Sequence, residues 1–172
     1  RVSELYGLTK ADIDFEARRI KVERQLTRTR HCEYYIEKPK TASGERYIPM
    51  TNEVYQAFQN AIQRRKQPKV ELLIDGHTGF LFLDKDGKPK VAMHLEHVMK
   101  RIVDRYNDTH EDQLPSITPH VLRHTFCTEM ASSGIDLKSL QYLMGHSDVG
   151  VTLNVYTHAS YETAQAAMKK AM

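Results

Sequence analysis

The stretch that most constrains the fold reads TPHVLRHTFCTEMASSGIDLKSLQYLMG and covers residues 118–145. It opens with Thr118, whose hydroxyl can cap a helix, followed by a proline suited to the first helical position. Gly134 lies where this helix should stop, because glycine readily adopts the left-handed conformation that ends helices. Asp136 can then cap a second helix that ends at Gly145. The stretch therefore predicts two helices joined by a short turn.

Further helical patterns lie on both sides of this pair. Apolar residues spaced by three and four positions predict one helix after Thr51 and another between Leu95 and Tyr106. A short helix is expected from about Ser147, and an alanine-rich helix from Tyr161 onward. The chain after residue 50 is therefore expected to be mainly helical.

Strand patterns lie in the first 50 residues. Polar and apolar residues alternate at 19–23, and short apolar runs follow at 34–36 and 47–49, with a turn at 42–44. Between positions 18 and 46, nine basic residues stand against four acidic ones, which gives a local charge of +5. This basic stretch is either the solvated face of a sheet or a hairpin suited to a polyanion. The predicted fold class is α+β, mainly helical, with a small three-stranded antiparallel sheet at one edge.

The composition of the chain is that of a globular protein rather than a disordered or fibrous one. Its 172 residues suffice for one ordinary domain, 40% of them are hydrophobic, and the 8 glycines and 6 prolines are scattered. The net charge of +3 permits a polyanionic partner without demanding one. No apolar run is long enough for a membrane span or a signal peptide. Cys32 and Cys127 cannot form a disulfide framework, so we expect a reducing, cytoplasmic location.

The sequence lacks the signatures of several common enzyme classes, including GxGxxG, HExxH and CxxC. His120 and His124 share one helical face, as zinc ligands often do, but Arg123 between them makes that face positive and disfavours a metal ion. We therefore predict no metal site. The first turn of a helix favours an anion, and a guanidinium there adds bidentate recognition of phosphate. This cluster is expected to bind a phosphate group, the alternative being that its cations are merely solvated.

Four segments of the chain, in order, resemble the sequence boxes of the tyrosine recombinase (phage-type integrase) family. Residues 1–5 resemble the first arginine box, 38–41 with 46–49 the lysine hairpin, 120–125 the HxLRH box, and 143–158 the box that ends in the nucleophile. Each box alone is a weak signal, whereas four in the family's order argue against chance agreement. The last two boxes are most similar to integrases of conjugative transposons, with phage integrases and resolvase-type recombinases as the alternative subfamilies.

The resemblance implies that DNA strands are cleaved and rejoined through a 3′-phosphotyrosyl intermediate, without metal, ATP or another cofactor. In that scheme Tyr156 is the nucleophile, and a phenol needs a base or strong local positive charge to attack near neutral pH. His120 would supply or tune the base, and Lys40 would protonate the departing 5′-oxygen as general acid.

The resemblance assigns the remaining roles to basic residues and one carboxylate. The implied donors to the non-bridging phosphate oxygens are Arg1, Arg123 and His146. The implied supporting residues are Glu4, which orients neighbouring basic groups, and His124. The weaker DNA-contact candidates on the hairpin are Lys38 and Arg46.

The resemblance also sets expectations for partners and domain organisation. The expected partner is double-stranded DNA at attachment sites, bound by a homo-oligomer in a tetrameric synapse. An excisionase or a host DNA-bending protein would be a further partner, with no membrane contact. The expected location is the bacterial cytoplasm, at the nucleoid during recombination. Residues 1–172 would form the catalytic domain, truncated before Arg1, because the family carries further helices and DNA-binding domains upstream.

Two other functions would use the same features. The helix pair within 118–145 has the proportions of a helix-turn-helix, which predicts a DNA-binding module without catalysis. Its second helix is apolar, however, with Lys138 as its only charge after Asp136. The basic residues lie on the first helix, which suits phosphate chemistry better than base reading. A topoisomerase-like activity would use the same phosphotyrosine chemistry without synapsis.

Overall fold

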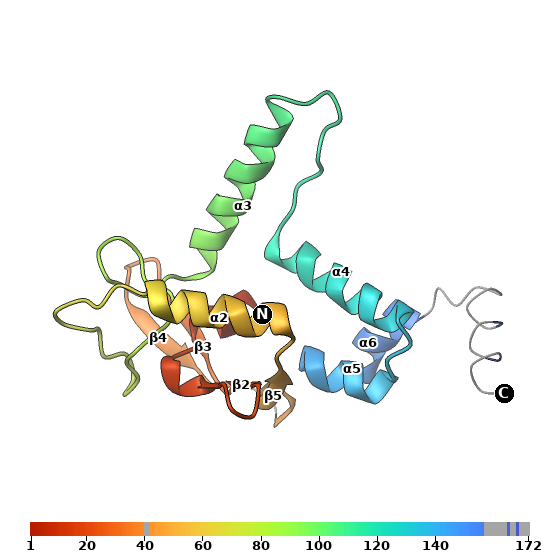
Figure 1. The fold of residues 1–172 in the computed structure, drawn as a ribbon, viewed down its shortest axis with the longest axis horizontal. Coiled ribbons are helices and arrows are strands. Elements are labelled where there is room, and N and C mark those ends of the chain that lie inside the picture. The colour runs from red at the N-terminus through yellow and green to blue at the C-terminus, as the bar shows by residue number, and fades with distance from the viewer. Residues whose placement is uncertain (40–41, 157–164, 166–167, 169–172) are drawn as a thin grey trace.

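The structure, a computed structural model, describes residues 1–39, 42–156, 165 and 168. In chain order its elements are α1 (Val2–Tyr6), the 3-10 helix η1 (Lys10–Asp12), β1 (Ile13–Asp14), β2 (Arg19–Val22), β3 (Gln25–Arg28), β4 (Tyr34–Glu37), the 3-10 helix η2 (Ala42–Gly44), β5 (Arg46–Pro49), α2 (Asn52–Arg64), α3 (Ala92–Asn107), α4 (Pro119–Ser132), α5 (Leu137–Met144) and α6 (Val149–Tyr156). Figure 1 shows the strands with α1 and α2 on one side, α4 to α6 on the other, and α3 projecting from between them. The predicted mainly helical α+β class is confirmed, and the helix expected from Tyr161 lies outside the described residues.

The predicted helix boundaries are confirmed at their caps. The side chains of Thr51, Thr118 and Asp136 each accept a hydrogen bond from the backbone N–H three residues further on, at 3.4, 3.2 and 2.9 Å. Gly134 and Gly145 have φ angles of +84° and +61°, in the left-handed region where glycine is favoured. Local residue chemistry therefore determines where α2, α4 and α5 begin and where α4 and α5 end.

The strands form two small antiparallel sheets rather than one. The first has the order β1-β2-β5 and pairs Ile20 with Ile48, whereas the second pairs β3 with β4 and sets Leu26 opposite Ile36. The three-stranded sheet was predicted, but the expectation that residues 34–36 belong to it was wrong. The side chains of β2 and β3 enter different apolar clusters, so the chain leaves the first sheet after β2 and starts a second.

Three separate apolar clusters hold the elements together. One lies between the three-stranded sheet and α2, a second joins α1, β3 and the extended segment around residue 80, and a third lies between α4, α5 and α6. They centre on Ile20 with Phe58, on Leu26 with Phe80, and on Cys127 with Leu140. The third cluster shares no member with the other two, so among the described residues the C-terminal helices meet the rest of the protein mainly through polar contacts.

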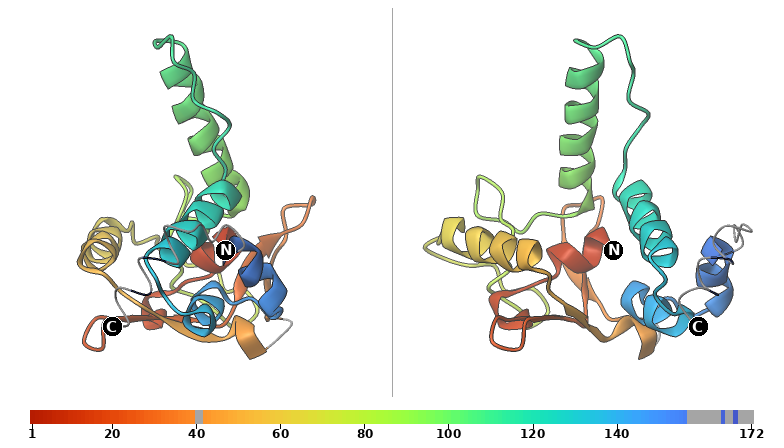
Figure 2. Two further views of the ribbon diagram at one scale, coloured as in Figure 1. Left: turned by 90° about the vertical axis from the view of Figure 1, so that its right-hand side faces the viewer. Right: turned by 45° about the vertical axis from the view of Figure 1, so that its right-hand side comes forward.

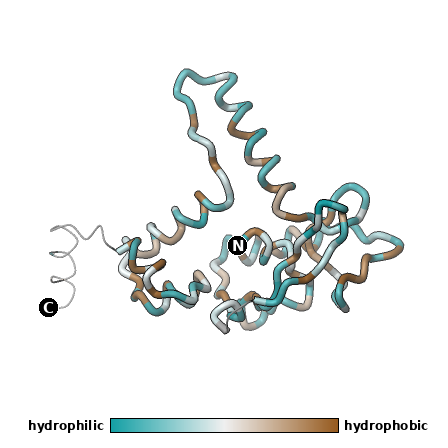
Figure 3. Tube along the Cα trace, turned by 180° about the vertical axis from the view of Figure 1, so that it is seen from behind, coloured by the Kyte–Doolittle hydropathy of each residue, from teal (hydrophilic) through white to brown (hydrophobic). Residues whose placement is uncertain are grey.

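The amphipathic helix predicted between Leu95 and Tyr106 is present as α3, but only part of its apolar face is buried. Met99 and Val103 are buried, whereas Ile102 is 61% exposed, on a helix that stands away from both sheets. Figure 3 shows apolar residues recurring along this projecting helix. Periodicity therefore identifies an apolar face without showing what covers it. Within the described ranges no helix, α3 included, is long and apolar enough to cross a membrane.

Leu140 is fully buried at the centre of the third cluster, so replacing it should leave a cavity between α4, α5 and α6. We expect Leu140→Ala to lower the free energy of unfolding by about 2–5 kcal/mol, measured by urea denaturation. Leu153→Ala on α6 is the matched control, because Leu153 is 47% exposed and its loss should cost less than about 1 kcal/mol. Equal effects of the two substitutions would contradict this account of the core.

Candidate active site

The site is built around the C-terminal end of α5. The last carbonyl groups of a helix have no partners within it. The backbone N–H groups of Gly145 and His146 take the carbonyls of Gln141 and Tyr142, which leaves those of 143–145. Gly145 is required twice over: its φ is +61°, and a Cβ there would lie 2.7 Å from Nη1 of Arg46.

Three guanidinium groups donate to these three carbonyls. The pairs are Arg46 Nε with Leu143 O (3.0 Å), Arg123 Nη2 with Met144 O, and Arg1 Nη2 with Gly145 O (3.1 Å). The arginines come from β5, from α4 and from the residue before α1, segments far apart in the chain that lie together near this helix end (Figure 2). Cations are favoured there because the helix dipole places partial negative charge at its C-terminus.

The carboxylate of Glu4 connects two of these arginines. It is 4% exposed and lies 2.8 Å from Nη2 of Arg46 and 2.7 Å from Nη1 of Arg1. Burial opposes its ionisation, but the hydrogen bonds and positive charges of Arg46 and Arg1 outweigh that effect and lower the pKa of Glu4 to about 2. Among the described residues of this cluster, three guanidinium groups therefore stand against one carboxylate, which pairs with Arg1 and Arg46.

The hairpin candidates have different positions in the structure. The side chain of Arg46 is 2% exposed and bonded to Glu4 and to backbone carbonyls, so it is held inside the protein, and the expected contact with DNA stays a prediction. Lys38 is exposed just after β4 and remains available to a partner. Lys40 lies outside the described residues.

His146 follows α5 directly and joins the cation cluster as a neutral group. Its ring Nδ1 lies 2.9 Å from Oγ1 of Thr152. Burial and the nearby charges of Arg123 and Arg1 lower the pKa of His146 to about 4. The ring is therefore uncharged at pH 7 and can serve as a hydrogen-bond donor through one nitrogen.

His120 and His124 form an exposed pair on α4, on either side of Arg123. Their Nε2 atoms are 3.1 Å apart and their rings meet edge to face. Such a contact needs one nitrogen to donate and the other to accept. Among the described residues, no group of three or more His, Cys, Asp or Glu is placed to hold a metal ion.

Tyr156, at the end of α6, has its hydroxyl turned toward the other end of α5. The hydroxyl donates to the carbonyl of Ile135 at 2.7 Å, just before the helix begins. Burial, together with the charge of Asp136, raises the pKa of Tyr156 above its ordinary value. Since α5 has eight residues and spans about 12 Å, the hydroxyl and the arginine cluster lie at opposite ends of one helix. The structure thus gathers Arg1, Glu4, Arg123 and His146, and places the hydroxyl of Tyr156 apart from them, at Ile135.

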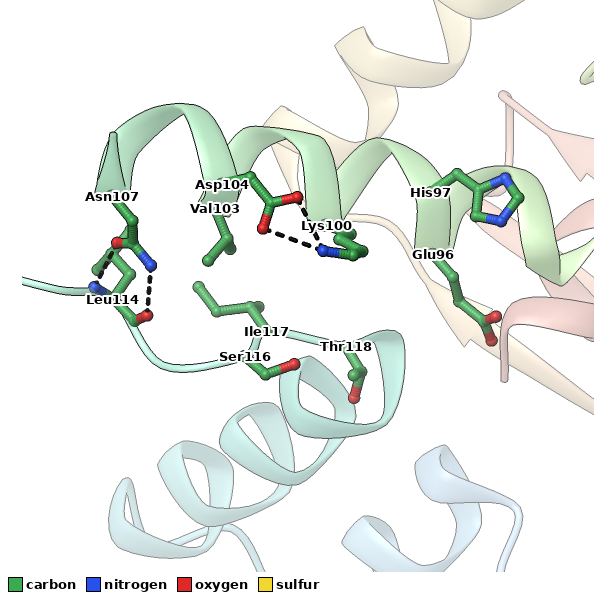
Figure 4. Close-up of a pocket in the computed structure, with 10 residues that line it drawn as sticks. All are labelled: Glu96, His97, Lys100, Val103, Asp104, Asn107, Leu114, Ser116, Ile117 and Thr118. Carbon is green, nitrogen blue, oxygen red and sulfur yellow. Dashed lines mark hydrogen bonds and ion pairs between the residues drawn. The ribbon is translucent and has the colours of Figure 1, made fainter. Parts of the chain in front are cut away.

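An open pocket of about 520 Å³ lies elsewhere, between α3 and the segment that leads into α4 (Figure 4). Some of the polar groups that line it bond one another: Lys100 pairs with Asp104, and the Asn107 side chain bonds the backbone of Leu114. None of the residues predicted to act in catalysis lines this pocket. The chemistry is therefore expected at the end of α5.

Reasoning from the sequence missed Thr152 and the three carbonyl acceptors. Thr152 is fully buried in α6, a helix whose other residues are largely apolar, and it contacts the ring of His146. A polar residue at the inward position of an apolar helix is the signal that could have identified it. The carbonyl acceptors carry no sequence signal beyond the glycine that ends α5.

Comparison with known proteins gives similar relatives among transposon-encoded enzymes. The chain is 50% identical to the transposase from transposon Tn916 of Enterococcus faecalis, over 99% of this chain and 42% of that protein. It is 33% identical to the tyrosine recombinase XerC of Bacillus subtilis, over 69% of this chain and 36% of that protein. The chain thus spans less than half the length of these relatives.

A solved structure shows the same arrangement of elements. The integrase of transposon Tn1549, in complex with transposon right end DNA, matches with a TM-score of 0.89 and 50% identity, over 99% of this chain and 54% of that one. The XerA recombinase, at 22% identity and a TM-score of 0.67, shares the fold. The sequence pattern of the phage integrase family matches residues 1–163, nearly the whole of this chain. With the arginines, histidines and tyrosine of its boxes in the family's order on the family's fold, the chain belongs to the phage integrase family.

Proposed function

We propose that this protein is a site-specific DNA recombinase that integrates or excises a conjugative transposon by cleaving and rejoining DNA strands. One observation carries the proposal: among the described residues of this cluster, the guanidinium groups of Arg1, Arg46 and Arg123 stand against the one carboxylate of Glu4, at a site that also bears His146. Such a site is suited to a phosphate whose negative charge grows during reaction. The similarity to the transposase of Tn916 supports the transposon assignment.

The phosphate would be held by groups that already have fixed positions. Arg1 and Arg123 each donate one guanidinium N–H group to a carbonyl at the end of α5. Each guanidinium has further N–H groups that can donate to phosphate oxygens. His146 is neutral and lies near these charges, so its ring adds an N–H donor to the site without adding a positive charge. Because the donors are fixed before the reaction, little reorganisation is needed as charge builds.

The chemical step would be a transesterification. Tyr156 first leaves the carbonyl of Ile135, because its hydroxyl cannot reach the arginine cluster from there. Its oxygen then attacks the phosphorus and its proton passes to His120, while the bond from phosphorus to the 5′-oxygen breaks. Lys40 protonates the leaving 5′-oxygen. Attack by the 5′-hydroxyl of a second strand on the phosphotyrosine reverses these bond changes and frees Tyr156.

The proposal extends to the assembly in which this chemistry takes place. The partner is double-stranded DNA at attachment sites, held in a tetrameric synapse in the bacterial cytoplasm, with an excisionase or a host DNA-bending protein as accessory factor. The Tn1549 integrase, 50% identical to this chain, has been solved in complex with its transposon end DNA, which supports the DNA partner.

A nicked suicide substrate tests the nucleophile. Cleavage releases a short strand that cannot return, so the wild-type protein should accumulate a covalent adduct with DNA, visible as a shifted band on a denaturing gel. Tyr156→Phe should abolish the adduct, because the attacking oxygen is gone. Tyr106→Phe on α3 is the control and should retain it. An adduct that persists in Tyr156→Phe would assign the nucleophile to another residue.

Arg46 should contribute to stability and not to DNA contact. Arg46→Met leaves the buried carboxylate of Glu4 without its main partner, which we expect to lower the free energy of unfolding by about 3–5 kcal/mol. Replacing Glu4 by Gln in the same variant should recover part of that loss. The exposed Arg30 provides the control, Arg30→Met, with little effect on stability.

DNA binding by Arg46→Met, measured below its unfolding temperature, should show an unchanged slope of log Kd against log salt. That slope counts phosphate contacts, and the guanidinium of Arg46 is buried and bonded to Glu4 and to Leu143 O. A shallower slope in the folded variant would instead place Arg46 at the DNA.

His146 should titrate near pH 4 in the free protein, measured from its ring signals by NMR, because its pKa is lowered from 6.5 to about 4. Between these values the folded state binds fewer protons at this group than the unfolded state. The stability it contributes is therefore present above pH 6.5 and is lost as the pH falls through 4. Bound duplex DNA should raise the midpoint, since an anion favours the protonated ring. A midpoint near 6.5 without DNA would contradict the positive field at the site.

A further inference from the structure

Thr152 is a buried polar side chain beside the site, and it takes no part in the proposed transesterification. It is fully buried, whereas Val151 and Leu153 on either side of it are exposed. At these three positions α6 turns apolar residues to the surface and a hydroxyl inward. A buried hydroxyl is unfavourable unless it is hydrogen-bonded, and the partner here is Nδ1 of His146 at 2.9 Å. This reversal of the usual pattern places Thr152 next to a group of the site.

The direction of the hydrogen bond follows from the surroundings of Thr152. If Nδ1 of His146 carried the proton, the hydroxyl would accept, and its own hydrogen would need another acceptor. Among the described residues, Nδ1 is the partner found for this side chain. A buried donor without an acceptor costs about 1–3 kcal/mol. An arrangement in which the hydroxyl donates and Nδ1 accepts leaves no such donor unpaired, and in it the proton of the neutral ring lies on Nε2.

The position of that proton matters because the ring is neutral. His146 faces four basic residues on three elements: Arg1 before α1, Arg46 on β5, and Arg123 and His124 on α4. Their charges and burial disfavour a second proton on the ring. A neutral imidazole has one N–H group, so the tautomer alone decides which edge donates. With Nδ1 turned to Thr152, Nε2 is the nitrogen left for an anion.

We propose that Thr152 is a positioning residue: by donating to Nδ1 of His146 at 2.9 Å, it orients the ring and keeps its proton on Nε2, the nitrogen that donates to the scissile phosphate. This inference rests on the proposed function for the identity of the anion. The tautomer and its dependence on Thr152 are properties of the free protein and can be measured without DNA.

The first measurement is the tautomer of His146 in the wild-type protein. With 15N-labelled histidine, long-range 1H–15N spectra at pH 7 distinguish a protonated Nε2 from a protonated Nδ1, and His146→Gln assigns the signals. We expect His146 to be protonated on Nε2. A ring protonated on Nδ1 would overturn the proposal.

The second measurement compares three variants. Thr152→Val removes the hydroxyl while keeping the branched shape, and we expect both tautomers of His146 to appear and single-turnover cleavage of the suicide substrate to fall about ten-fold or more. DNA affinity should not change, because Thr152 is buried. Thr152→Ser restores a hydroxyl and should restore both the tautomer and the rate. Thr128→Val is the control, since that hydroxyl bonds the backbone carbonyl of His124.

The outcomes separate a positioning role from a structural one. Slow cleavage by Thr152→Val with the tautomer unchanged, or a changed tautomer with full activity, would overturn the proposal. If Thr152→Val does not fold, Thr152→Ala replaces it, and a ring still held as the Nε2 tautomer in that variant would also overturn it. Failure of the proposed function has a different signature: the wild-type protein would form no DNA adduct, whatever the tautomer of His146.

Discussion

The unpaired carbonyl groups at the C-terminal end of α5 are the constraint on which the rest of the structure depends. They need donors because the helix supplies none, and they attract cations because the helix dipole ends there. Arg1, Arg46 and Arg123 supply those donors from three distant parts of the chain. The apolar cluster of α4 to α6 shares no member with the other two, so this polar contact is what positions the C-terminal helices against the sheets.

The same contact explains how a concentration of positive charge is tolerated. The buried carboxylate of Glu4 offsets part of the repulsion between the guanidinium groups. The partial negative charge at the end of α5 offsets a further part. What remains is a positive site with rigid donors, which is the property that phosphate chemistry requires. Burial and this field keep His146 neutral, so the detail that matters at His146 is which nitrogen holds its proton. The same side chains thus hold the C-terminal helices in place and form the positively charged site.

Much of the fold could be predicted from local chemistry. The caps at Thr51, Thr118 and Asp136 and the glycine ends at 134 and 145 were confirmed, because each depends on residues within one helical turn. The pairing of β4 was not predictable in the same way, because it depends on which apolar cluster each strand enters. The exposed side of α3 was missed for a related reason: periodicity gives a face and not its neighbour.

For the site, the residue types and their order can be read from the chain alone, and its four boxes identified the family. The contacts of each residue with its neighbours depend on the folded arrangement of the chain. That arrangement buried Arg46 against Glu4, turned the hydroxyl of Tyr156 to Ile135, and set Thr152 against the ring of His146. The physical reason is that charge, burial and hydrogen-bond direction act through space. Residues such as Arg1 and Gly145, 144 positions apart in the chain, come into contact only when the helix end gathers them.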